Sequence, residues 1–201
     1  MKTMRVSCDS KGVNIAIRTF RNGGIVVFPT DTVYGIGCDP YNKNAIKSLY
    51  QIKNRDPSKL FPILGFSKRE LSEIAVFDEM ADKISEKFWP GQITLVLKLK
   101  DKKLKQSLNL DEKIAVRVPK NPCALSILKE CKLIVGTSAN ISGSQSFRDP
   151  DECIRNISGY DLFVDGGIIS SKGESTVVEI DNDLKVLRPG IISKEEIMDL
   201  F

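Results

Sequence analysis

The hydrophobic positions of the chain follow two patterns, one typical of helices and one typical of strands, and the two alternate along the sequence. Apolar residues at 13, 16, 17 and 20 share one face of a helix, so the pattern predicts a helix over 13–20. A short apolar run over 25–28 is typical of a buried strand. Similar patterns predict further helices over 45–52, 68–75, 79–88, 122–129 and 151–157 and at the end of the chain. They predict further strands over 61–64, 93–99, 114–118, 133–135, 162–164, 175–180 and 184–187.

This order of elements predicts an α/β fold. Strands alternate with helices through most of the chain, but the last strands follow one another closely, and Asp-Asn-Asp at 181–183 is a hairpin signal. The combination favours a twisted mixed sheet with flanking helices over a purely parallel sheet. Because no internal repeat, low-complexity tract or linker interrupts the sequence, residues 1–201 are predicted to form one domain.

Composition narrows the classes of function. Of the 201 residues, 41% are hydrophobic and 28% are charged, and the net charge is +4, as is ordinary for a soluble globular protein. The basic stretch over 98–105 is interpreted as a solvated loop rather than a binding patch. The chain has no histidine, which excludes serine–histidine and cysteine–histidine catalysis and imidazole-ligated zinc.

The cysteines and the apolar segments indicate the cellular compartment of the protein. The five cysteines lie at 8, 38, 123, 131 and 153 without any C-x-x-C spacing, so we expect reduced thiols and no four-cysteine zinc site. No apolar stretch approaches the roughly 20 residues that cross a bilayer. The N-terminal segment has basic residues but lacks the apolar centre of a signal peptide. We therefore expect a cytoplasmic protein that does not contact membranes.

Two polar segments follow predicted strands. Residues 29–37, PTDTVYGIG, gather hydroxyls and one carboxylate, and Gly35 and Gly37 are expected where the backbone bends or approaches a ligand. Residues 136–143, GTSANISG, suit the binding of an anion or a substrate. Ser138 is predicted to donate hydrogen bonds rather than to act as a nucleophile, because no histidine can activate it. On local chemistry alone, each segment is equally well explained as a polar turn.

Several cations are candidate ligands for anionic groups. Lys53, Arg55 and Lys59 lie within seven residues, where they either hold a polyphosphate or form the solvated end of a helix. Arg117, on predicted strand 114–118, is either an exposed residue or a clamp for a carboxylate. Arg188 precedes Pro189-Gly190 and is either a surface cation or a phosphate ligand.

The ordered motifs resemble one family. They are PTDTVYGIG, K-x-R, FWPGQITLVL, AVRVP, GTSANISG, STVVEI and LRPG, and the resemblance runs from about residue 10 to about residue 192. This order resembles the YrdC-type threonylcarbamoyl-adenylate synthases of tRNA modification. The resemblance implies a twisted mixed sheet that encloses a concave basic site. It implies an enzyme that condenses L-threonine, bicarbonate or CO2 and ATP to threonylcarbamoyl-AMP and pyrophosphate, with Mg2+ accompanying ATP. A separate transferase then modifies the adenosine next to the tRNA anticodon.

The resemblance also implies roles for individual residues. It makes Lys53 and Arg55 the catalytic pair that holds the phosphates of ATP. The implied threonine-binding residues are Thr32, Arg117, Ser138 and Ser175. The implied ATP-binding residues are Lys53, Arg55, Lys59, Asn140 and Arg188, and no protein-held metal is implied. Asp31 and Tyr34 are either structural or in contact with substrate.

Some positions depart from the family pattern. Asp56 separates Arg55 from Pro57, Lys59-Leu60-Phe61 replaces the usual Lys-Pro-Leu, and a histidine often found soon afterwards is absent. These changes leave the threonine contacts near 60–66 unassigned. Because the chain ends soon after LRPG, it resembles the single-domain form of the family.

Two other functions stay open. One is an RNA-binding or ribosome-maturation homologue, which the modest charge and the lack of aromatic residues interleaved with basic ones disfavour, although a weak tRNA contact fits. The other is a carbamoyl-transfer sister protein, against which the K-x-R and S-x-N pair favours the threonine enzyme.

Overall fold

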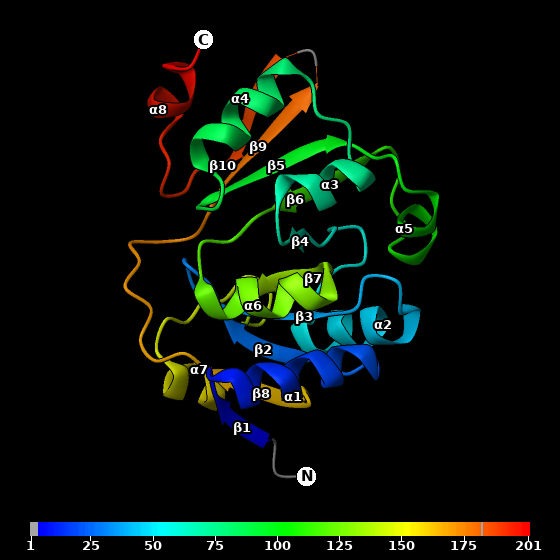
Figure 1. Ribbon diagram of the computed structural model, residues 1–201, viewed down its shortest axis with the longest axis vertical. Helices are drawn as coiled ribbons and strands as arrows, with labels where there is room; N and C mark the ends of the chain where they lie inside the picture. The colour runs from blue at the N-terminus through cyan, green and yellow to red at the C-terminus, as the bar shows by residue number, and fades with distance from the viewer. Residues whose placement is uncertain (1–3, 182) are drawn as a thin grey trace.

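A twisted mixed sheet runs through the computed structural model, which describes residues 4–181 and 183–201 (Figure 1). Its strands are β1 (Met4–Ser7), β2 (Val26–Pro29), β3 (Tyr34–Cys38), β4 (Ile63–Gly65), β5 (Ile93–Lys98), β6 (Lys113–Arg117), β7 (Leu133–Ser138), β8 (Leu162–Asp165), β9 (Thr176–Asp181) and β10 (Asp183–Arg188). The helices are α1 (Ser10–Arg21), α2 (Lys43–Lys53), α3 (Lys68–Ile74), α4 (Glu79–Phe88), α5 (Lys102–Ser107), α6 (Pro122–Cys131), α7 (Pro150–Asn156) and α8 (Lys194–Met198).

The strands lie in the order β1-β8-β2-β3-β7-β4-β6-β5-β9-β10. The pairs β1·β8, β8·β2, β4·β6 and β5·β9 are parallel, and the other neighbours are antiparallel. The predicted mixed α/β sheet is therefore confirmed. Each predicted helix and strand has a counterpart in the structure, and the sharp turn expected after the predicted strand 175–180 is the antiparallel β9–β10 hairpin, although Asn182 lies outside the described residues.

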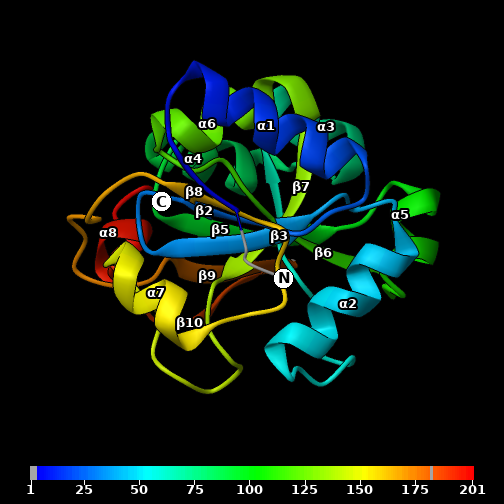
Figure 2. The same cartoon turned by 90° about the horizontal axis from the view of Figure 1, so that it is seen from below.

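Helices cover both faces of the sheet (Figure 2). On one face lie α1, α6, α3 and α4, and on the other lie α2 and α7. The helical stripe predicted over 13–20 is confirmed, because Ala16, Ile17 and Phe20 of α1 are buried against α6, β2 and β8. Asp9 caps this helix by accepting a hydrogen bond from the Gly12 amide. The described helices include none long and apolar enough to cross a membrane.

The structure corrects two of the predicted irregular segments. The stretch over 98–105 is not all loop, because Asp101 caps α5 through the amides of Lys103 and Leu104, and the Leu104 side chain is fully buried. Gly35 and Gly37 lie within β3 rather than in a bend, and Gly35 lines the cavity described below. A Cβ at Gly37 would lie 1.9 Å from the Val135 carbonyl oxygen, so the β3–β7 pairing requires a glycine there.

The prediction that all five cysteines are reduced is wrong for one pair. Cys8 and Cys123 form a disulfide, whereas Cys38, Cys131 and Cys153 are free thiols. The partners are 115 residues apart in sequence, and the pairing of β1 with β8 and the packing of α1 on α6 bring them together. Sequence spacing cannot reveal such a contact. Strand β1 itself escaped prediction because it is only four residues long and mostly exposed.

Candidate functional site

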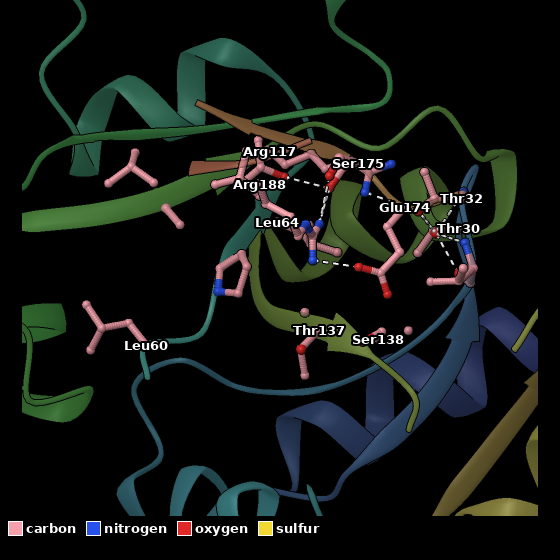
Figure 3. Close-up of a pocket in the computed structure, with 18 of the residues that line it drawn as sticks. Thr30, Thr32, Leu60, Leu64, Arg117, Thr137, Ser138, Glu174, Ser175 and Arg188 are labelled. Atoms are coloured by element: carbon pink, nitrogen blue, oxygen red, sulfur yellow. Dashed lines mark hydrogen bonds and ion pairs between the residues drawn. The ribbon is translucent and has the colours of Figure 1, made fainter. Parts of the chain in front are cut away.

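Residues of the sheet and of its loops enclose a cavity of about 350 Å3. Strands β3 to β7, β9 and β10 and the loop after α2 contribute its walls. Figure 3 shows the side chains of several of these elements converging on one space. Six of the nine predicted site residues line it: Thr32, Arg55, Arg117, Ser138, Ser175 and Arg188. Most of the predicted site residues therefore line one cavity.

The loop between β2 and β3 holds two threonine hydroxyls at one end of the cavity. The Thr30 hydroxyl accepts hydrogen bonds from the amides of Thr32 and Val33, at 3.1 and 3.2 Å, and donates to the Val33 carbonyl at 2.6 Å. The hydroxyls of Thr30 and Thr32 are 3.1 Å apart. This self-bonded turn fixes Thr32, which is buried, against the cavity. Tyr34 points elsewhere: its hydroxyl donates to the Gly167 carbonyl at 2.8 Å, so its role is structural.

Arg117 projects from β6 into the buried end of the cavity. Its Nε donates to the Gly91 carbonyl at 2.9 Å, its Nη1 to the Thr32 hydroxyl at 3.2 Å and its Nη2 to Asp31 at 2.7 Å. The ion pair with Asp31 is buried, and burial lowers the pKa of Arg117. A guanidinium has more N–H donors than these three contacts use, and Nη1 and Nη2 each keep one for an anion. Of the two alternatives for Arg117, the exposed residue is excluded, because its side chain is buried and lines the cavity.

Arg188 and Ser175 form a second polar group on β9 and β10. Nη2 of Arg188 donates to the Ser175 carbonyl at 2.8 Å and lies 3.1 Å from its hydroxyl. Nη1 pairs with Glu174 at 2.6 Å. The Ser175 hydroxyl also lies 3.0 Å from that of Thr94. These contacts hold the Arg188 guanidinium over the cavity (Figure 3).

Arg55 lies on the opposite wall, in the loop after α2. Its Nε and Nη2 donate to the carbonyls of Lys59 and Leu60, at 2.8 and 2.9 Å, and its guanidinium lies 5.1 Å from the Phe61 ring centroid. These partners leave the charge of Arg55 uncompensated, and burial lowers its pKa. The Lys59 side chain is exposed and does not line the cavity; this residue contributes its carbonyl.

Lys53 and Asn140 lie behind the cavity wall. Nζ of Lys53 donates to the carbonyls of Ser138 and Asn140, at 2.5 and 2.7 Å, and the side chain is buried. Burial first, and the charge of Arg55 second, lower the pKa of Lys53 to about 8. The Asn140 amide donates to the carbonyls of Ile141 and Ser144, whereas its buried Oδ1 has no partner in the described part of the chain. Both residues therefore shape the turn that carries Ser138.

Sequence reasoning missed several lining residues. Thr94 and Val96 on β5, and Lys113 and Ala115 on β6, face the cavity at the two-residue period of a strand. The alternation around Arg117 was the signal that could have found them. Glu174, the acid among the described lining residues, had no such signal, because it precedes β9 in a loop.

The cavity suits anionic ligands. Arginines at three places and hydroxyls at both ends surround it, and Glu174 is the only carboxylate among its described lining residues. No group of three potential His, Cys, Asp or Glu ligands for a metal occurs in residues 4–181 and 183–201. The arrangement can hold and orient several anions side by side without supplying a nucleophile.

Known proteins are similar to this chain in fold and in sequence. The family model Sua5_yciO_yrdC, described as "Telomere recombination", matches residues 18–190. The threonylcarbamoyl-AMP synthase of Bacillus subtilis strain 168 is 34% identical over 201 residues, which cover 97% of this chain and 58% of that protein. The crystal structure of P. abyssi Sua5 complexed with L-threonine has a TM-score of 0.88 and 30% identity, covering 100% of this chain and 61% of that one.

A shorter relative matches over nearly its whole length. The E. coli YciO crystal structure has a TM-score of 0.84 and 28% identity, covering 94% of this chain and 96% of that one. The chain thus spans about three-fifths of the first two relatives and almost all of the third.

Proposed function

The chain belongs to the Sua5–YciO–YrdC family, and we propose that it condenses L-threonine, bicarbonate or CO2 and ATP to threonylcarbamoyl-AMP and pyrophosphate. The observation that carries this proposal is the cavity itself, in which Arg55, Arg117 and Arg188 face one space together with the hydroxyls of Thr32 and Ser138. The name of the B. subtilis relative and the L-threonine bound to P. abyssi Sua5 support the same activity.

The chemistry needs no nucleophile from the protein. The threonine amine becomes a carbamate, one carbamate oxygen attacks the α-phosphorus of ATP, and pyrophosphate leaves. The protein has to hold a carboxylate, a carbamate and a triphosphate in line and to offset their charge. A cavity lined by arginines and hydroxyls, in a chain without histidine, suits that task.

In this proposal the two substrates occupy different ends of the cavity. The unused donors of Arg117, beside the Thr32 hydroxyl, suit the carboxylate of threonine. Ser138 and Ser175 present hydroxyls to the same space. Arg55 and Arg188 suit the phosphates, and the exposed side chain of Lys59 would add charge from outside the lining. Asn140 and Lys53 would act on the nucleotide from behind the wall, through the turn that carries Ser138.

Mg2+ enters as part of the nucleotide substrate in this proposal. Glu174 is the only acid among the described lining residues, and it already pairs with Arg188. These residues do not make a protein cage for the ion, which in such sites is held mainly by phosphate oxygens and water. Mg2+ would offset charge on the phosphates while the arginines orient them.

The product requires an acceptor. We propose that a separate tRNA-modifying transferase takes the threonylcarbamoyl group in the cytoplasm, where tRNA and ATP meet. A direct tRNA contact with this chain would be weak, because the net charge is only +4.

The proposed reaction can be assayed directly. The protein is incubated with ATP, Mg2+, labelled bicarbonate and each amino acid in turn, and pyrophosphate release is followed. Release that depends on threonine and places the label in an adenylate supports the proposal. Absence of turnover with every amino acid, together with salt-sensitive RNA binding, would favour the RNA-binding alternative instead.

Replacing Arg55 with alanine is expected to weaken ATP binding by about tenfold, because one charge-assisted contact to phosphate is lost. The fold should survive, since Arg55 donates only to carbonyls of its own loop. Calorimetric titration with ATP measures the effect. Arg69→Ala, which removes an exposed arginine on α3, is the matched control. Equal ATP affinity in the Arg55 and Arg69 variants would remove Arg55 from the nucleotide site.

A further inference from the structure

Glu174 places a carboxylate inside a cavity built for anions. Its Oε2 lies 2.6 Å from Nη1 of Arg188, and the side chain reaches between Arg188 and the threonines Thr30 and Thr32 (Figure 3). Only Oε2 takes part in that ion pair, so Oε1 keeps its lone pairs for a ligand. The ion pair with Arg188 occupies one oxygen of this carboxylate, and the other oxygen can accept hydrogen bonds from a cationic part of a substrate.

The position of Glu174 relative to Arg117 indicates which cation. Figure 3 shows Glu174 beside Thr32, whose hydroxyl accepts a hydrogen bond from Nη1 of Arg117, so Glu174 and Arg117 line the same part of the cavity. Glu174 also directly precedes Ser175, whose hydroxyl lies in the same part of the cavity. An α-amino acid carries an ammonium group one carbon away from its carboxylate. A carboxylate held by Arg117 would leave that ammonium in need of an anionic acceptor.

We propose that Glu174 binds the α-ammonium group of the amino-acid substrate and accepts the proton that its nitrogen releases as the bond to CO2 forms. The proposal rests on the proposed function and assigns a residue to its first chemical step. Among the described lining residues, the remaining candidate base is Lys113, whose ammonium already pairs with Glu179 and Asp181.

The step balances. Bicarbonate takes the first proton from the ammonium and breaks down to CO2 and water, leaving a neutral amine. The nitrogen lone pair then attacks the carbon of CO2, and one C=O electron pair moves to oxygen. The nitrogen loses its second proton to the Glu174 carboxylate, which becomes neutral. The products are the carbamate, water and protonated Glu174, and solvent then removes the proton.

A binding experiment isolates the ammonium contact. Wild type and Glu174→Gln are titrated with L-threonine and with 3-hydroxybutanoate, which keeps the carboxylate and hydroxyl but lacks the amine. Wild type is expected to prefer threonine by about 30-fold, and the amide variant to lose most of that preference while its affinity for 3-hydroxybutanoate changes little. Glu179→Gln is the matched control, because it removes the same charge from an acid that pairs with Lys113. An unchanged preference in Glu174→Gln overturns the proposal.

A turnover assay distinguishes a failure of this inference from a failure of the proposed function. In threonine-dependent pyrophosphate release, Glu174→Gln should lower kcat by about 100-fold. If Glu174 only positioned Arg188, the variant would raise the KM for ATP and keep its preference for threonine, which overturns the inference. Full activity of the variant overturns it as well. A further outcome is that wild type binds threonine in preference to 3-hydroxybutanoate without releasing pyrophosphate. If Glu174→Gln then lacks that preference, the result supports the ammonium site and contradicts the synthase reaction.

Discussion

Replacing Arg117 with methionine is expected to weaken threonine binding by about 100-fold and to lower the free energy of unfolding by about 3–5 kcal/mol. The first effect follows from the loss of the donors that face the cavity. The second follows from Asp31, whose side chain is only 8% exposed and would keep a buried charge without its partner. Calorimetric titration with threonine and with ATP, and denaturant unfolding, measure the two effects separately.

A double variant distinguishes the two roles of Arg117. In Asp31→Asn/Arg117→Met the buried charge is removed together with its partner, so most of the lost stability should return. Threonine affinity should stay low, because the guanidinium is still absent. ATP affinity should change little in either variant. If the double variant recovered threonine binding with its stability, Arg117 would be a structural residue only.

The sequence predicted the elements of the fold well where hydrophobic spacing was strong. The helical stripe of α1 and the apolar run of β2 were recognised, because their buried residues recur at the period of one element. Helix α5 was missed, since Leu104 is its single buried residue in a basic segment. The disulfide between Cys8 and Cys123 depends on the pairing of distant elements, which local patterns do not contain.

The sequence predicted individual residues of the candidate site but not the contacts between them. Hydroxyl and arginine positions were found because the motifs carry those residue types. That Arg117 pairs with Asp31, and that the Lys53 amine bonds to carbonyls, depends on how β6 and α2 approach other parts of the chain. Lys53 is the clearest case: its charge predicted a phosphate ligand, whereas its side chain lies outside the cavity wall. Its role in holding phosphate stays a prediction.

Replacing Lys53 with methionine is expected to lower turnover by about 100-fold, because the turn that carries Ser138 and Asn140 loses its support and small displacements of oriented groups are costly. The Lys53 amine joins the carbonyls of those two residues. Lys53→Arg is the conservative control, since it keeps the charge but changes the shape of the donor. Turnover close to wild type in Lys53→Met would show that the turn keeps its conformation without the Lys53 amine.

The pH dependence of stability tests the burial of this amine. Its pKa is about 8 in the folded chain, below the ordinary 10.5, so between these values the unfolded chain holds the proton more tightly. The contribution of Lys53 to the free energy of unfolding therefore rises with pH through that window, by about 2.5 kcal/mol from pH 7 to pH 10. Tyr34 and Cys38, whose pKa values are raised by burial, act in the opposite direction. Their effects cancel in the difference between wild type and Lys53→Met, which should grow in favour of wild type as the pH rises. A difference that stays constant from pH 7 to pH 10 would mean that the pKa of the Lys53 amine is not lowered in the folded chain, and it would contradict the expected effect of burial.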